Sequence, residues 1–128
     1  MSQVWVDTNV VLRYLLRDNE AQAQIAKDLI EGGAFLIPEV LKETSHVLRT
    51  FYEFDRQNIA TQLLIVLDWV TMERKAVMIR AVEIFAETNL DFVDCILAAY
   101  HELENAKVFT FDKKLNKQLK QEEKRFET

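Results

Sequence analysis

Apolar residues recur every three or four positions along most of the chain, a spacing that is typical of amphipathic helices. Helices are predicted over residues 8–17, 20–31, 38–52, 56–68, 75–87, 91–105 and from 113 onward. Short apolar runs lie between them and are predicted as strands, at residues 3–6, 34–37, 69–73 and 107–111. Strands that alternate with helices favour a parallel sheet covered on both faces. The pattern predicts an α/β three-layer sandwich with a short parallel sheet of four or five strands and helices in the majority.

Turn-forming residues are few but well placed. Gly32 and Gly33 follow the second predicted helix and mark its end. Pro38 fits the first turn of the next helix, where its missing N–H is not needed. The chain has only two glycines and one proline, which favours long helices and short connections. Its 128 residues predict a single domain spanning residues 1–128.

Four acidic residues stand at related positions in this pattern. Asp7 and Asp112 each end an apolar run, whereas Glu43 and Asp94 lie about one turn inside a predicted helix. If the two runs are neighbouring parallel strands, their carboxylates leave the sheet at the edge where α/β proteins bind ligands. Like charges at ~4 Å repel by about 1 kcal/mol in water and ~4 kcal/mol at an effective dielectric constant of 20. A hard divalent ion such as Mg²⁺ or Mn²⁺ relieves that repulsion.

Each acid also has a purely structural explanation. Asp7 and Asp112 precede predicted helices and could be simple N-caps. Asp91 and Asp94 have the spacing of a capping box at the start of a helix. Glu43 could be an exposed helical acid, or it could pair with a neighbouring base. The structural explanation is adequate for any one position. Helix capping does not, however, require the four acids to lie together at one edge of the sheet.

The remaining composition narrows the chemistry. The chain has no Ser-His pair, no reactive cysteine context and no glycine-rich phosphate loop, which leaves metal-assisted hydrolysis. Its net charge of −5 argues against a broad basic surface for nucleic acid. Residues 107–125 nevertheless hold seven bases against three acids. This basic segment is either a solvated helix face or an edge beside Asp112 that contacts phosphate.

The cellular context is also suggested by what the sequence lacks. Cys95 is the single cysteine, so an intrachain disulfide is impossible, and a free thiol suits a reducing compartment. The N-terminus shows no basic leader followed by an apolar stretch. The longest apolar run, residues 63–67, is too short to cross a bilayer. We expect a soluble, cytoplasmic protein that does not associate with membranes.

Four segments together resemble a known family. Residues 4–12, Val-Trp-Val-Asp-Thr-Asn-Val-Val-Leu, are similar to the opening of the PIN-domain family, in particular of its VapC-like toxin branch. Residues 37–43, 89–99 and 109–115 are similar to its second, third and fourth acidic segments. The resemblance covers essentially the whole chain in order. The family usually closes with a strand after the last helix, but only residues 124–128 remain here for that fifth strand.

The resemblance implies a metal-dependent endoribonuclease that acts as the toxin of a type II toxin–antitoxin system. Its catalytic residues would be Asp7, Glu43, Asp94 and Asp112. Asp7 and Asp94 would be the primary ligands of Mg²⁺ or Mn²⁺, Asp112 would complete the site or hold a second ion, and Glu43 would act directly or through water. The polar groups that orient these carboxylates would be Thr8, Asn9, Thr110 and Asp91. The resemblance also implies a cognate VapB-like antitoxin and a homodimer.

The RNA substrate and two other classes of function stay open. Net negative charge favours recognition of RNA shape and unpaired bases, so a structured RNA such as tRNA is the expected substrate. A phosphoacceptor receiver domain would have a similar size and an acidic pocket. That class expects adjacent acids after the first strand, where Thr8 and Asn9 follow Asp7, and a lysine at the place of Asp112. A non-catalytic binding module whose acids only cap helices is the other alternative.

Overall fold

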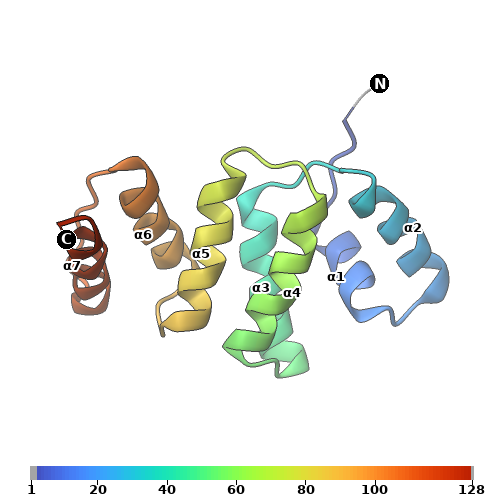
Figure 1. The fold of residues 1–128 in the computed structure, drawn as a ribbon. Coiled ribbons are helices and arrows are strands. Elements are labelled where there is room, and N and C mark those ends of the chain that lie inside the picture. Colours follow the sequence, from blue (N-terminus) through green and yellow to red (C-terminus); the bar gives the residue numbers. More distant parts are fainter. Residues whose placement is uncertain (1–2, 128) are drawn as a thin grey trace. The chain divides into compact units, whose positions relative to one another are not determined.

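The computed structural model describes the backbone of residues 3–127 and the side chains up to residue 121. Helices make up 71% of the chain. In chain order they are α1 (Thr8–Leu16), α2 (Glu20–Glu31), α3 (Pro38–Tyr52), α4 (Arg56–Trp69), α5 (Lys75–Glu87), α6 (Phe92–Glu104) and α7 (Lys113–Glu127) (Figure 1). Each agrees to within a residue or so with a helix that the apolar spacing predicts. Within the described residues, none of these helices combines the length and the apolar character needed to cross a membrane.

Local signals set the ends of these helices. The side chains of Asp7, Asn19 and Asp55 accept hydrogen bonds from backbone N–H groups in the first turns of α1, α2 and α4. Pro38 starts α3 as the sequence predicts. Gly33 follows α2 with a φ of 91°, a conformation that a residue with a Cβ adopts only under strain. The helices are therefore fixed largely by residues that lie within a few positions of their ends.

The predicted sheet of four or five strands is wrong, and so is the three-layer sandwich built on it. Within residues 3–127 the extended segments meet only as isolated parallel bridges, between Trp5 and Phe35 and between Phe35 and Thr71. Backbone hydrogen bonds flank these bridges, for example from Phe35 N–H to Val4 O at 2.7 Å. Only one residue of each segment pairs, although residues 3–7 and 34–37 lie outside helices and turns. Single bridges of this kind do not make the ladder that defines a sheet.

The segment at residues 107–111 was predicted as a strand and is not one. It has no bridge to any described segment, and its recorded hydrogen bonds are to the start of α7. Phe109 and Phe111 are 83% and 91% exposed, and their rings meet edge to face with centroids 5.1 Å apart. The tail does not supply a closing strand either, because α7 continues as helix through Glu127.

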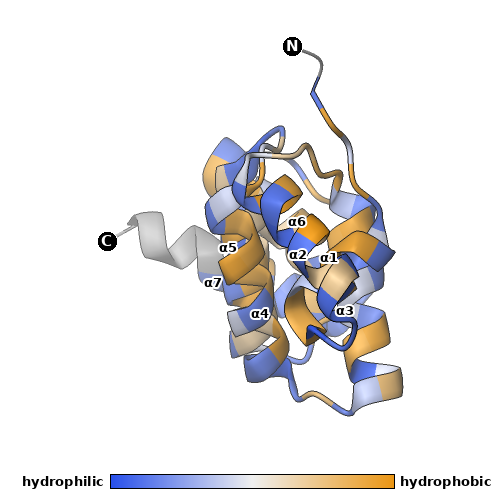
Figure 2. Ribbon diagram, turned by 90° about the vertical axis from the view of Figure 1, so that its right-hand side faces the viewer, coloured by the Kyte–Doolittle hydropathy of each residue, from blue (hydrophilic) through white to orange (hydrophobic). Residues whose placement is uncertain are grey.

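The chain divides into two compact units, Met1–Lys75 and Ala76–Thr128. In the first unit α1 packs on α2 and α3, and α4 packs on α3 and α2. Its fully buried side chains include Val11, Ile30, Leu36, Leu41, Leu48, Ile59, Leu63 and Leu67. In the second unit α6 packs on α7, and the core includes Met78, Ala81, Ile84, Cys95, Ala98 and Leu115. Both units bury one side of amphipathic helices, whose apolar and polar residues Figure 2 distinguishes. The single domain over residues 1–128 stays a prediction.

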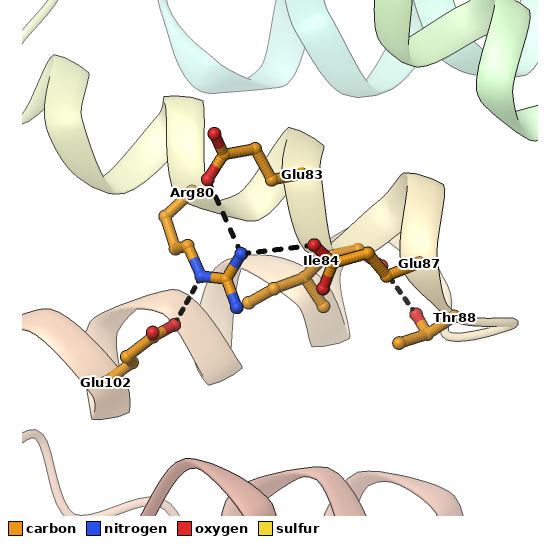
Figure 3. A network of polar contacts seen from close by, with 6 residues as sticks. All are labelled: Arg80, Glu83, Ile84, Glu87, Thr88 and Glu102. Carbon is orange, nitrogen blue, oxygen red and sulfur yellow. Dashed lines mark hydrogen bonds and ion pairs between the residues drawn. The ribbon is translucent and has the colours of Figure 1, made fainter. Parts of the chain in front are cut away.

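A buried charge network links α5 to α6 inside the second unit (Figure 3). The guanidinium of Arg80 donates to the carboxylate of Glu102 at 2.5 Å, and both side chains are about nine-tenths buried. Arg80 also pairs with Glu83 at 3.4 Å and with Glu87 at 3.6 Å, on the surface of α5. Phe85 and Phe92 pack beside one another with ring centroids 5.6 Å apart. These contacts hold the helix that carries Asp94 against its neighbour.

Candidate functional site

Asp94 lies at the centre of an acidic cluster in the second unit. It is the third residue of α6, and its side chain is partly buried. Burial raises the pKa of the Asp94 carboxyl, and the nearby charges of Asp91 and Asp112 raise it further. Within the described part of the chain, no Lys, Arg or His side chain forms an ion pair with Asp94. The ionised carboxylate is therefore held in a place that disfavours its charge.

The three acids of this cluster are engaged differently by the helices. Asp91 occupies the N-cap position of α6, yet its side chain makes no capping hydrogen bond. Asp112 does cap α7, because its Oδ1 accepts from the N–H of Lys114 at 2.8 Å and of Leu115 at 3.1 Å. The cap explanation is thus confirmed for Asp112 and wrong for Asp91. Neither the Asp91 nor the Asp94 carboxylate makes a capping hydrogen bond.

Thr110 shapes the turn that presents Asp112. Its hydroxyl accepts a hydrogen bond from the N–H of Asp112 at 3.0 Å. Its carbonyl oxygen accepts from Nδ2 of Asn116, also at 3.0 Å. Both bonds fix the backbone just before α7. Thr110 therefore acts on the position of the Asp112 backbone rather than on its carboxylate.

Asp7 and Glu43 belong to the first unit. Asp7 follows the bridged segment at residues 4–6, and its Oδ1 accepts from the N–H of Val10 at 3.1 Å, so it also caps a helix. The residues expected to support it, Thr8 and Asn9, form the first turn of α1. Glu43 is exposed on α3 and lines a surface groove of about 590 Å³. Among the described residues it forms no ion pair with Lys42 or His46, although both line the same groove.

The structure gathers the predicted site residues into two sets. The first unit holds Asp7, Thr8, Asn9 and Glu43, and the second holds Asp91, Asp94, Thr110 and Asp112. Within the second set, the charges of Asp91 and Asp112 both act on Asp94. Convergence of Asp7 and Glu43 with Asp94 stays a prediction.

The donor set of the second unit fits a hard divalent cation. Carboxylate oxygens are the ligands that Mg²⁺ and Mn²⁺ prefer. Among the side chains that the structure describes, no three acidic, histidine or cysteine side chains lie close enough to enclose an ion. Mg²⁺ does not require such a cage, since it typically takes one or two protein carboxylates and completes its shell with water and phosphate. Asp94 and one neighbouring acid would meet that requirement.

Comparison with known proteins identifies the family. The family model for the PIN domain matches residues 4–119, and the chain belongs to the PIN-domain family. PIN domains are typically nucleases that use divalent metal ions, so nuclease chemistry is the class of activity that the family defines. Neither a curated protein nor a solved structure matches the chain significantly.

Two features of the second unit have no counterpart in the sequence predictions. The first is the pair of Arg80 and Glu102, which lie 22 residues apart without a motif that would connect them. The second is a pocket that Asn89 and residues of α7 line together, where the sequence predicts only a basic edge. The side chains of Lys124 and Arg125, which belong to that predicted edge, lie outside the described residues. The one available signal was that Asn89 is the first residue of the third acidic segment, two positions before Asp91.

We expect Asp94→Asn to stabilise the metal-free protein at neutral pH. Because the folded protein raises the pKa of Asp94, this group stabilises the fold only below its unfolded pKa of about 3.8. This stability is lost as pH rises through the pKa of the folded state. At pH 7 the ionised carboxylate destabilises the folded protein, and the neutral asparagine removes that effect. Thermal unfolding in EDTA at pH 7 should show a higher midpoint for the variant, and the gain should vanish near pH 3.

The matched control for this prediction is Glu20→Gln. Glu20 is the first-turn acid of α2, so its loss removes the same helix-dipole stabilisation without relieving any acidic cluster. We expect this control to lower the midpoint slightly. A fall of similar size in Asp94→Asn would show that Asp94 is an ordinary first-turn acid.

Proposed function

We propose that the protein is a Mg²⁺- or Mn²⁺-dependent endoribonuclease that hydrolyses RNA phosphodiester bonds. The observation that carries the proposal is the partly buried carboxylate of Asp94, which lies beside Asp91 and Asp112 with no ion-pair partner among the described residues. Membership of the PIN-domain family supports the same class of chemistry. Neighbouring carboxylates without a cation lower the stability of the folded protein. A bound divalent ion would offset their repulsion.

The roles of the individual residues follow from this proposal. The carboxylates of Asp7 and Asp94 would hold the metal, and Asp112 would complete the site with the oxygen that its cap of α7 does not use. Glu43 would accept a proton from the attacking water or position that water. When bound, a divalent ion supplies positive charge against the phosphate and lowers the pKa of coordinated water. Asp91, Thr8, Asn9 and Thr110 keep the ligands in position.

The proposal extends to the partners of the protein. We take the substrate to be a structured RNA such as tRNA, because the net charge of −5 favours recognition of RNA shape and unpaired bases over a broad basic surface. We further propose that the enzyme is a homodimeric, VapC-like toxin that a cognate VapB-like antitoxin neutralises. Expression of the protein alone would then arrest growth, and co-expression of the small protein encoded beside it would restore growth.

Cleavage of total cellular RNA by the purified protein tests the activity. We expect discrete fragments with Mn²⁺ or Mg²⁺ and none with EDTA. Cleavage that persists in EDTA would contradict the metal-dependent reaction. Mn²⁺ binding without cleavage would indicate a binding module, and covalent labelling by a small phosphodonor would indicate a receiver domain.

A further inference from the structure

A polar pocket of about 280 Å³ lies in the second unit, between α7 and the segment that leads into α6. Lys114, Lys117 and Gln121 line it from α7, at positions that share one side of the helix. Asn89 and Leu90 line it from the preceding segment. The pocket is thus built from one unit and combines two cations, three carboxamides including that of Gln118, one hydroxyl and one apolar side chain.

The two lysines give this pocket a positive charge. Both Lys114 and Lys117 are exposed, and neither forms an ion pair with any acid whose side chain the structure describes. Asp112 does not neutralise Lys114, because the hydrogen bond between them uses the backbone N–H of the lysine. Two ammonium groups on one wall of a pocket favour an anionic ligand, and phosphate is the anion that lysine commonly binds.

The carboxamides give the same pocket groups that can read a nucleobase. Asn89 and Gln121 are both exposed and carry a donor and an acceptor each, which matches the paired donors and acceptors on base edges. Leu90 is 5% exposed and offers an apolar surface beside them. The volume is near the lower limit of about 300 Å³ for small-molecule sites, which suits one nucleotide.

The pocket borders the acidic cluster through the chain itself. Leu90 immediately precedes Asp91, and the N–H of Lys114 donates to Oδ1 of Asp112 at 2.8 Å. A nucleotide in the pocket would therefore lie next to the residues proposed to hold the metal. Its phosphate would be attracted to the lysines and kept apart from the uncompensated carboxylates.

We infer that this pocket binds one unpaired nucleotide of the RNA substrate, adjacent to the bond that is cleaved. Lys114 and Lys117 contact the phosphates, and the carboxamides of Asn89 and Gln121 contact the base edge. The inference rests on the proposed ribonuclease function and adds how the enzyme selects its cleavage site. It predicts that the RNA is recognised where a base is free of pairing, as is usual for sequence-specific RNA recognition.

Binding of a labelled, mixed-sequence single-stranded RNA in EDTA tests the pocket without interference from cleavage. The test variant is Lys114→Ala with Lys117→Ala. The control is Lys113→Ala with Lys120→Ala, which removes the same charge from exposed positions of α7 that do not line the pocket. The pocket variant should weaken binding and reduce the slope of log K against log salt by about 1.4, for two lost phosphate contacts on a single strand. The control should keep the slope of the unmodified protein.

The outcomes separate this inference from the proposed function. If the unmodified protein cleaves RNA and both double variants lose affinity and slope equally, the pocket assignment is wrong while the nuclease assignment stands. If the unmodified protein neither binds nor cleaves RNA, the pocket assignment and the ribonuclease assignment are both wrong. Asn89→Ala should keep the slope but change the preferred sequence at the cleavage site. Cleavage at unchanged positions would contradict base recognition by Asn89.

Discussion

Asp7→Asn and Asp94→Asn are each expected to abolish RNA cleavage while the helices stay intact. Asparagine keeps the shape of the side chain but removes the negative charge that a divalent ion requires. Loss of a partner that merely orients a ligand typically costs 10–100-fold. Loss of a ligand itself should therefore lower the cleavage rate by more than about 100-fold. The rate is measured on a defined RNA at saturating Mn²⁺, with circular dichroism to check the fold.

The structure explains why these variants should fold. Asparagine serves as an N-cap about as well as aspartate, so Asp7→Asn can keep the hydrogen bond to the N–H of Val10. The side chain of Asp94 makes no hydrogen bond to the described residues that the variant would lose. The matched control is Asp55→Asn, which changes an N-cap that accepts from Asn58 N–H at 2.8 Å and has no proposed role in the site. Full activity of folded Asp7→Asn or Asp94→Asn would remove the metal-site assignment.

Arg80→Met is expected to cause a large loss of stability in the second unit. The variant leaves the Glu102 carboxylate, which is about nine-tenths buried, without the guanidinium that donates to it. Removing one partner of a buried ion pair typically costs about 3–5 kcal/mol, because the remaining charge is still desolvated. Urea unfolding should show a free energy of unfolding lower by that amount.

The control for this prediction is Arg13→Met in the first unit. Arg13 pairs with Asp18 at 2.6 Å, but both side chains are partly exposed and water can replace the bond. We expect a much smaller change in the free energy of unfolding. The double substitution Arg80→Met with Glu102→Leu should recover most of the loss. Equal losses for Arg80→Met and Arg13→Met would show that burial does not strengthen the Arg80 network.

The candidate site could be read from the sequence only in part. The spacing of Asp91 and Asp94 at the start of a helix follows from the chain pattern, as does the position of Asp112 just before α7. The sequence could not show that one carboxylate oxygen of Asp112 accepts the capping hydrogen bonds of α7, whereas the carboxylate of Asp91 accepts none at α6. Nor could it show that burial disfavours the charge of Asp94, because burial depends on packing between helices.

The sequence by itself determined the helices of this protein, because apolar spacing and capping residues such as Asp7, Asn19 and Pro38 act over a few positions. Pairing of the extended segments was decided by the tertiary structure. A strand needs a partner backbone at matching register, and an apolar run does not encode that partner. Residues 107–111 read as a strand yet have no bridge to any described segment, whereas Trp5, Phe35 and Thr71 pair by single residues. Tertiary packing alone also produced the Arg80–Glu102 pair and the pocket beside Asp112, since both join residues that are far apart in the chain.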